Sequence, residues 1–358
     1  MRKIILSIIL AIAASFSIAA TPDSLKKDLE DYDYMVSFVE QNYAPFDAIM
    51  QKGYKREYKA LKKQLRKQLS KGEANLEKAA NEYVFWFFSQ FDGHLLLETI
   101  SFQLDYICKV IPRYDLLMNY APKPVSCKVD SCTWLIRVPS CDEELLKHEW
   151  VRNAAQQYLE SGCDNLIIDV RGNMGGLDGV WVPYYDMLYD HPGKELVVWF
   201  RNTKDNLTVS EKYVPDADFV ERCHSLKKKF VFWASMLNDP EQKPQLRPKR
   251  AAILIDRLTC SAGESIVSYV KSKSNRAKVY GKENTLGAAE TGNVNTTMLP
   301  NSKITLSYPT CVDASFYDKT FIGAAGLTPD IKIPLDYPKQ LTDNIDDWVL
   351  WVAEDLKK

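Results

Sequence analysis

Residues 251–264 constrain the fold of this chain more than any other stretch. They begin with a short run of apolar residues, pass through a turn, and enter a helical pattern that starts at Ser261. An apolar run of this length that ends in turn residues is typical of a strand buried on both faces of a largely parallel sheet. Ser261 is therefore predicted at the carboxyl edge of that sheet, where open α/β sheets bind ligands. The amino end of the following helix would point there, which favours a negatively charged group.

A second buried strand is predicted at residues 165–170, and it continues directly into a turn with three glycines at residues 171–176. It is preceded by a predicted strand at 133–138 and by a helix at 145–159. A strand, a helix and a second strand in this order predict a right-handed parallel unit. The fold class is therefore predicted to be α/β.

The other predicted elements follow from hydrophobic periodicity and from turn residues. Helices are expected at residues 23–43, 55–70, 75–90, 180–189 and 345–356. Strands are expected at residues 195–201, 277–281 and 304–308, with irregular strands over 95–124 and a charged segment from 202 to 250. A helical domain at residues 21–94 is thus expected to precede the sheet.

Composition excludes some classes of partner. The chain has 358 residues, 46% of them hydrophobic, and a net charge of −1. This balance gives no indication of binding to nucleic acid or to an anionic membrane. The sequence does not indicate an oligomeric state.

Residues 1–20 have the pattern of a cleavable secretory signal. Two basic residues precede an apolar core at 4–16, and small residues follow before Thr21. No later run has the roughly 20 apolar residues that a transmembrane helix needs. We therefore expect an exported protein, periplasmic or secreted, without a transmembrane segment.

The cysteines and histidines give weaker signals. Cys127 and Cys132 are close enough to form a small disulfide loop, and the other six cysteines could be buried thiols, but the sequence does not reveal the pairing. His148, His191 and His224 show no metal-ligand spacing, so no metal and no other cofactor is predicted.

Three groups could carry chemistry, and each has a plain structural interpretation. Ser261 could be a nucleophile, but with Glu264 it also fits the helix capping box Ser-x-x-Glu. His94 follows a glycine that suits a tight turn, although a lone histidine is more often a packed side chain. The glycines at 172–176 could form an ordinary turn between a strand and a helix.

Four motifs, taken together, resemble the tail-specific, or C-terminal processing, serine peptidases. Residues 168–176 resemble that family's Asp-Leu-Arg-Gly-Asn-Gly-Gly-Gly turn, and residues 259–264 resemble its nucleophile segment. Residues 91–94 resemble its Asp-Gly-His motif, and residues 326–330 resemble its closing Gly-Val-x-Pro-Asp turn. The four occur in the order that the family has.

This resemblance implies a ClpP/crotonase-like core of stacked strand-strand-helix units, here residues 95–358, after a helical domain. Many members use a Ser-Lys pair, but the matching position here is Ala288. The chain is therefore more similar to the tricorn-core branch, which uses a histidine from the Asp-Gly-His region. The interval between His94 and Asp169 is too short for the family's PDZ insert beside the strand and helix predicted there, so that insert is not expected.

The resemblance also assigns roles to residues. Ser261 would be the nucleophile and His94 the base, since imidazole accepts protons near neutral pH. The oxyanion would be bound by the amide of Ala262 and by an amide of Gly175 or Gly176. Asp318 is the predicted orienting acid, with Asp313 as the second choice.

The function predicted on these grounds is an exported serine endopeptidase that hydrolyses extended or C-terminal polypeptide segments. The alternative is a catalytically reduced protein that binds peptides or apolar ligands, because the chain is also similar to interphotoreceptor retinoid-binding protein. A third alternative is an acyl-transfer or hydratase enzyme of the crotonase type, for which the sequence has no positive feature.

Overall fold

A computed structural model describes residues 22–111, 122–213, 217–318, 321–338 and 345–358. The predicted signal at residues 1–20 lies outside these ranges. The helices are α2 (Pro22–Asn42), α3 (Phe46–Ile49), α4 (Lys55–Ser70), α5 (Leu76–Phe88), α6 (Cys108–Val110), α8 (His148–Ser161), α9 (Val182–Leu188), α10 (Lys204–Tyr213), α11 (Ala217–Leu226), α12 (Ala262–Lys273) and α13 (Asp347–Asp355). Short helical turns are η1 (Met50–Tyr54), η2 (Phe102–Ile107), η3 (Asp178–Trp181), η4 (Ala314–Tyr317) and η5 (Gly323–Ala325).

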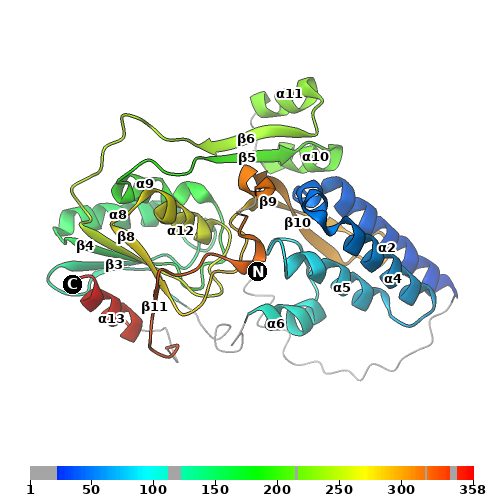
Figure 1. Cartoon of the computed structure of the whole chain (residues 1–358), viewed down its shortest axis with the longest axis horizontal. Coiled ribbons are helices and arrows are strands. Elements are labelled where there is room, and N and C mark those ends of the chain that lie inside the picture. Colours follow the sequence, from blue (N-terminus) through cyan, green and yellow to red (C-terminus); the bar gives the residue numbers. More distant parts are fainter. Residues whose placement is uncertain (1–21, 112–121, 214–216, 319–320, 339–344) are drawn as a thin grey trace.

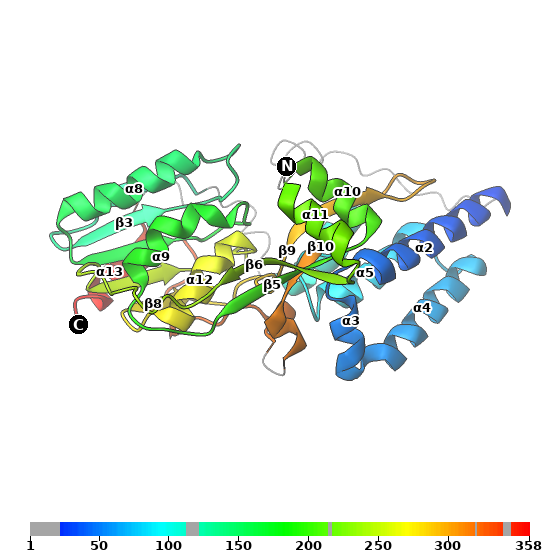
Figure 2. The same ribbon diagram turned by 90° about the horizontal axis from the view of Figure 1, so that it is seen from above.

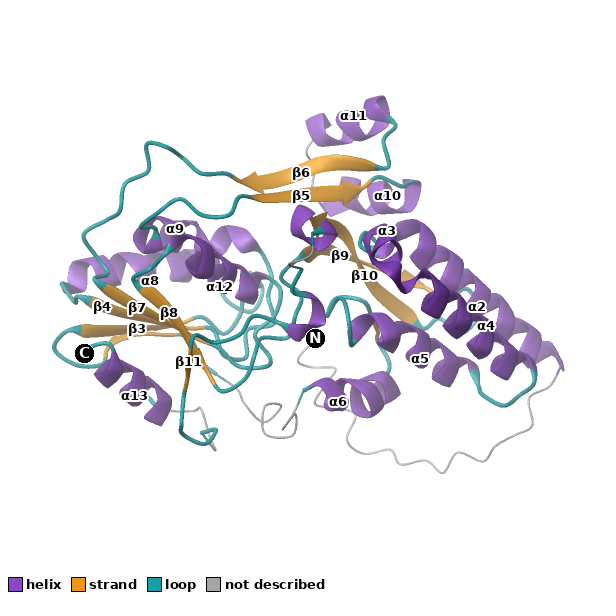
Figure 3. Cartoon of the chain, viewed as in Figure 1, coloured by secondary structure: helices purple, strands orange, loops and turns teal. Residues whose placement is uncertain are grey.

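The strands form two sheets, drawn in orange in Figure 3. They are β1 (Leu96–Leu97), β2 (Val125–Lys128), β3 (Thr133–Arg137), β4 (Asn165–Asp169), β5 (Leu196–Arg201), β6 (Phe230–Met236), β7 (Arg250–Leu254), β8 (Ala277–Gly281), β9 (Thr291–Met298), β10 (Thr305–Asp313) and β11 (Ile331–Lys332). The larger sheet has the order β11-β8-β7-β4-β3-β2 and is parallel except for the pair β2 and β3. The predicted α/β class is confirmed.

Helices cover both faces of this parallel sheet, as Figures 1 and 2 show. Successive residues of its central strands alternate between two hydrophobic cores. In β4, Leu166 and Ile168 pack with α8, α9 and α12, whereas Ile167 packs with α13. The central positions of a strand buried on both faces are apolar, which is why these strands are visible in the sequence.

The second sheet is antiparallel and has the order β1-β10-β5-β6, with β9 also paired to β10. It adjoins the N-terminal helices, and α2 and α5 share one hydrophobic core with Leu306 and Tyr308 of β10. This core crosses the predicted boundary between positions 94 and 95. The helices on the N-terminal side of that boundary therefore pack directly on strands from near the end of the chain.

Several predictions about local structure were wrong. Residues 102–110, where irregular strands were expected, are helical in η2 and α6. The charged segment before β7 contains α10, α11 and β6, which were not predicted.

The sequence left the state of the cysteines open. Cys127 and Cys132 are free thiols, as are the other six cysteines. Within the described ranges no helix is long and apolar enough to span a bilayer.

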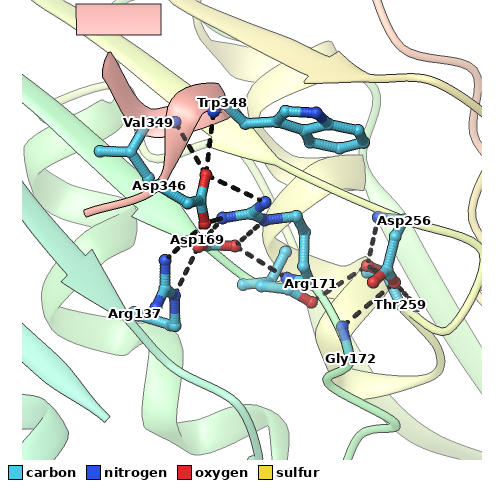
Figure 4. Close-up of polar contacts among 10 residues, drawn as sticks. Arg137, Asp169, Arg171, Gly172, Asp256, Thr259, Asp346, Trp348 and Val349 are labelled. Carbon is cyan, nitrogen blue, oxygen red and sulfur yellow. Dashed lines mark hydrogen bonds and ion pairs between the residues drawn. The ribbon is translucent and has the colours of Figure 1, made fainter. Parts of the chain in front are cut away.

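A buried ion-pair network joins the end of β4 to α13 (Figure 4). Asp169 lies between two arginines, with 2.6 Å from its Oδ2 to Arg137 Nε and 2.8 Å from its Oδ1 to Arg171 Nε. Asp346 accepts from Arg171 Nη2 at 2.7 Å and caps α13 by accepting from the amide of Trp348 at 2.9 Å. Burial alone would raise the pKa of Asp169, but the two guanidinium groups outweigh it and hold that pKa below its usual range.

We predict that Asp169→Asn removes about 3 to 5 kcal/mol of unfolding free energy, because it takes away the buried counter-charge that lies between two buried arginines. Urea unfolding at neutral pH measures this. Asp164→Asn, at an exposed pair with Lys249, is the matched control and should have little effect.

Because the folded pKa of Asp169 is lowered, its contribution to the unfolding free energy exists above the ordinary aspartate pKa and is lost as the pH falls below it. A difference between Asp169→Asn and wild type that does not shrink below about pH 4 would contradict this account.

Candidate active site

Ser261 lies in the turn between β7 and α12, where the sequence predicts it. Its backbone has φ of 54° and ψ of −124°, a region that residues with a side chain seldom occupy. Strain of this kind persists only where neighbouring contacts enforce it, and it is common at functional turns. The serine is thus held in an unusual conformation directly before the first amides of α12.

The buried carboxylate of Glu264 holds this turn in place. It accepts hydrogen bonds from the amides of Ser261 at 3.0 Å, Gly287 at 3.0 Å and Ala288 at 2.8 Å, and from the hydroxyl of Thr285. Burial raises the pKa of Glu264, although these hydrogen bonds oppose the shift. The predicted capping interaction is present, and the same carboxylate also ties the serine turn to residues 285–288.

The glycine turn after β4 packs main chain against main chain on the serine turn. A Cβ atom on Gly175 would lie 2.7 Å from Cβ of Ser261, and one on Gly263 would lie 2.6 Å from the carbonyl oxygen of Asn173. The amide of Cys260 donates to that same carbonyl at 2.9 Å. The close approach explains why small residues occur at both positions.

The amides predicted for the oxyanion hole differ in availability. Gly175 donates its amide to the side-chain oxygen of Asn173 at 2.8 Å, so it has no amide to offer a ligand. Gly176 and Ala262 donate their amides to none of the hydrogen-bond acceptors in the described ranges. Of the predicted pair of glycines, Gly176 is therefore the one whose amide has no acceptor among the described residues.

His94 lies on the loop that follows α5, and its loop contacts the segment bound by Glu264. The amide of Gly93 donates to the carbonyl of Gly287 at 3.1 Å, and the next residue, Ala288, donates to Glu264. Because Glu264 also accepts from Ser261, the His94 loop and the serine turn are both joined by hydrogen bonds to residues 287–288 or to the carboxylate that binds them.

The two ring nitrogens of His94 have different surroundings. Nδ1 lies 2.7 Å from the hydroxyl oxygen of Thr291, which donates to Oδ1 of Asp92 at 2.6 Å. Since the Thr291 hydroxyl gives its proton to Asp92, it accepts from Nδ1–H, which leaves Nε2 unprotonated in the neutral ring. Nε2 is buried and has no hydrogen-bond partner among the described residues, the Ser261 hydroxyl included.

The predicted orienting acids do not reach His94. Asp318 is exposed, and its Oδ2 lies 3.8 Å from Nζ of Lys194. Asp313 caps η4 by accepting from the amide of Ser315 at 2.7 Å. The carboxylate beside His94 is Asp92, whose Oδ1 lies 3.5 Å from Nδ1 and accepts from the His94 amide at 3.0 Å. A local signal existed for it, since aspartate two positions before a turn amide commonly accepts from that amide.

Within the described ranges, no group of three or more His, Cys, Asp or Glu side chains could hold a metal ion. The candidate groups are the Ser261 hydroxyl, the backbone amides of the two turns, and the His94 ring with the Thr291–Asp92 pair. Such an arrangement can deprotonate a hydroxyl and bind an oxyanion.

Comparison with known proteins agrees with this interpretation. The model of peptidase family S41 matches residues 133–333, more than half of the chain. The chain belongs to peptidase family S41. The matched S41 region contains Ser261, the glycine turn and Thr291, and it begins after His94. No curated protein sequence matches the chain.

Solved structures share the fold over almost the whole chain. A candidate peptidase from Parabacteroides merdae is 15% identical, with 95% of this chain and 98% of that chain covered and a TM-score of 0.54. Mature CPAF is 12% identical, with 93% and 96% covered and a TM-score of 0.55. At these identities the likeness concerns the fold.

The contact between His94 and Thr291 yields a prediction about proton location. In ¹⁵N-labelled protein at neutral pH, NMR should show the neutral His94 ring with its proton on Nδ1, and His94→Ala would identify its signals among the four histidines. Thr291→Val keeps the shape but removes the hydroxyl, so it should shift the ring towards a mixture of tautomers. Asp318→Asn is the control and should change nothing. A proton on Nε2 in the wild type, or a shift in Asp318→Asn, would contradict this assignment.

Proposed function

We propose that this S41 peptidase is a serine endopeptidase that hydrolyses peptide bonds in extended or C-terminal polypeptide segments by a Ser-His mechanism. One observation carries the proposal, namely that the buried Nε2 of His94 lacks a partner among the described residues while Nδ1 is bound to the Thr291–Asp92 pair. A buried nitrogen without a partner is costly and rare, so it points to a function. A free Nε2 with an oriented ring is what a general base requires.

The proposed reaction uses this base twice. Ser261 Oγ attacks the carbonyl carbon of the scissile bond, and its proton passes to His94 Nε2. The imidazolium is stabilised by Asp92 through Thr291 and then gives the proton to the leaving amine. Water attacks the acyl-enzyme in the same way and releases the second product. The Ser261 hydroxyl is not bonded to Nε2 in the structure, but such hydrogen bonds often tighten only when substrate binds.

The oxyanion of each tetrahedral intermediate would be bound by the amides of Ala262 and Gly176. Neither amide is bound to another described group, and Ala262 is the first residue of α12, so the positive end of the helix dipole adds to the field. A donor of this kind typically contributes about 100- to 1000-fold in rate.

Two side chains support the binding of an extended polypeptide here. Met174 and Leu177 flank the glycines of the turn and are 60% and 62% exposed, so apolar surface lies on both sides of these glycines in the chain. Beside the proposed oxyanion hole they would contact apolar side chains of the substrate. Membership of family S41 supports the same substrate class.

A fluorophosphonate tests the mechanism. We expect one adduct on the wild type by intact mass, none on Ser261→Ala, and labelling slowed about 100-fold or more in His94→Ala. Ser265→Ala is the matched control, because this hydroxyl lies one turn further along α12 and donates to Asp178 at 2.6 Å. It should label like the wild type.

The opposite result would be decisive. If folded wild-type protein forms no adduct, the peptidase mechanism is wrong, and binding of peptides or apolar ligands becomes the function to examine. An adduct that persists in Ser261→Ala would instead place the reactive group elsewhere.

We also propose that the protein is exported to the periplasm or beyond, which the pattern of residues 1–20 supports. Expressed with its leader in a Gram-negative bacterium, the chain should be recovered from the periplasm. Its intact mass should be that of a chain whose first residue is near Ala20 or Thr21. Leu10→Arg places a charge in the apolar core of the leader and should block processing. A full-length chain in the cytoplasm of cells that carry the unmodified leader would refute export.

A further inference from the structure

One buried carboxylate binds both turns of the candidate site. Asp256 is 1% exposed and follows β7 closely. Its Oδ1 accepts from the amide of Gly172 at 3.1 Å and from that of Thr259 at 3.1 Å, residues labelled in Figure 4. It also accepts from the amide of Leu258 at 2.9 Å. The first amide belongs to the glycine turn, and the other two belong to the serine turn.

These contacts lie close to the proposed reacting atoms on both sides. Gly172 begins the turn that carries the Gly176 amide, and Thr259 stands two positions before Ser261. The Thr259 hydroxyl reinforces the same junction, because it donates to the carbonyl of Val170 at 3.0 Å and accepts from the amide of Asp256 at 3.1 Å. A change at Oδ1 would therefore be transmitted to both turns together.

We infer that Asp256 is a positioning residue, whose carboxylate fixes the distance between Ser261 and the oxyanion-hole amide of Gly176. The inference rests on the proposed function for its effect on rate, but the positioning itself does not depend on catalysis. In this role Asp256 contacts neither substrate nor His94 and affects the proposed site only through the two turns.

The charge of Asp256 matters because one oxygen accepts from three amides, and an ionised acceptor binds amides more strongly than a neutral one. Burial raises the pKa of Asp256 to about 6, although the amides of Gly172 and Leu258 and the nearby Arg171 lower it. Asp169 is the other charged group that acts on it, and it raises the pKa. The carboxylate is therefore ionised at neutral pH and becomes neutral in mildly acidic solution.

This charge lowers the stability of the fold at neutral pH. Because the pKa of Asp256 is higher in the folded than in the unfolded chain, the folded protein binds the extra proton, and protonation stabilises it. The stabilisation appears as the pH falls through about 6 and is complete below the ordinary aspartate pKa of about 3.9. A buried charge that opposes folding is consistent with a role in the site.

Asp256→Asn tests the inference, since it keeps the shape and one acceptor oxygen but removes the charge. At about pH 7.5 we expect faster amide deuterium exchange in both residues 171–176 and residues 256–262, and fluorophosphonate labelling about 10- to 100-fold slower. The melting temperature should stay equal to that of the wild type or rise. A merely structural carboxylate would instead lower it.

The pH dependence separates Asp256 from His94. The ratio of wild-type to Asp256→Asn labelling rates should fall towards one near pH 4.5 to 5, roughly one unit below the pKa, because wild-type Asp256 is then neutral too. Both proteins carry the same His94, so the ratio isolates the change at Asp256. A ratio that does not change with pH would overturn the charge-dependent part of the inference.

Asp130→Asn is the matched control. Asp130 also accepts from two turn amides, those of Cys132 and Thr133, both at 2.9 Å, but it lies between β2 and β3 at the amino ends of the parallel strands. Burial acts to raise the pKa of Asp130, but hydrogen bonds from Cys132, Lys357 and Thr133 lower it to about 2, so this variant should lose stability. Its exchange at the two site turns and its labelling rate should match those of the wild type.

The outcomes are distinguishable. Unchanged exchange in both turns together with unchanged labelling in Asp256→Asn overturns the inference, and so does a general rise in exchange with a lower melting temperature. If the wild type does not label but exchange rises in both turns of Asp256→Asn, the positioning role holds and the proposed peptidase mechanism fails.

Discussion

The geometry of the site depends on the hydrogen bonds that the buried carboxylate of Glu264 accepts. It accepts from the amides of Ser261, Gly287 and Ala288, and so it joins the serine turn to the segment on which the His94 loop packs. Without this acceptor, three amides would be buried without partners, each at a cost of about 1 to 3 kcal/mol. The helix-capping and nucleophile interpretations of Ser-x-x-Glu are therefore compatible, because the cap is what holds the serine in place.

Two kinds of buried carboxylate occur in this molecule, and they differ in what neutralises them. Asp169 is paired with two arginines, which keep its pKa low. Its charge therefore stabilises the fold at pH values above the usual aspartate pKa. Glu264 and Asp256 are bound mainly by backbone amides, and burial leaves their pKa values raised. The first arrangement fastens α13 to the sheet. The second fixes the backbone of the turns, at some expense of stability.

Local sequence signals predicted the parallel sheet well and the rest of the fold less well. Strands such as β4 and β7 are buried on both faces, and their central positions are all apolar for that reason. Strand β6 has one buried position among its seven residues and follows the charged residues 227–229, and β9 is mostly polar, so neither is a strand buried on both faces. Strand β6 pairs with β5 across residues 202–229, whereas β9 pairs with the next strand, β10, across a short turn, and its polar side chains give no apolar pattern.

The turns that carry the candidate residues were predicted where a motif fixes the backbone, whereas Asp318, which was assigned by position alone, does not contact His94. Ser261, His94, Ala262 and Gly176 lie on turns whose glycines and caps are visible in the sequence. Asp318 was chosen by its distance from the closing turn, and it lies instead at the exposed end of η4. Asp92 and Thr291 meet only in the folded chain, because 199 positions separate them.

The surroundings of Ala288 leave little room for a longer side chain. Many tail-specific peptidases have a lysine there, but Ala288 is 2% exposed and lies in the hydrophobic core with Phe91 and Leu286. A Cβ atom on Gly93 would lie 3.5 Å from that of Ala288, so the His94 loop already occupies the space into which a longer side chain would extend. A lysine at this position would have to displace the loop that carries His94, or else bury its ammonium group among apolar side chains at a large cost in free energy. A lysine at position 288 and the loop that carries His94 would therefore compete for the same space, and in this chain the loop fills it.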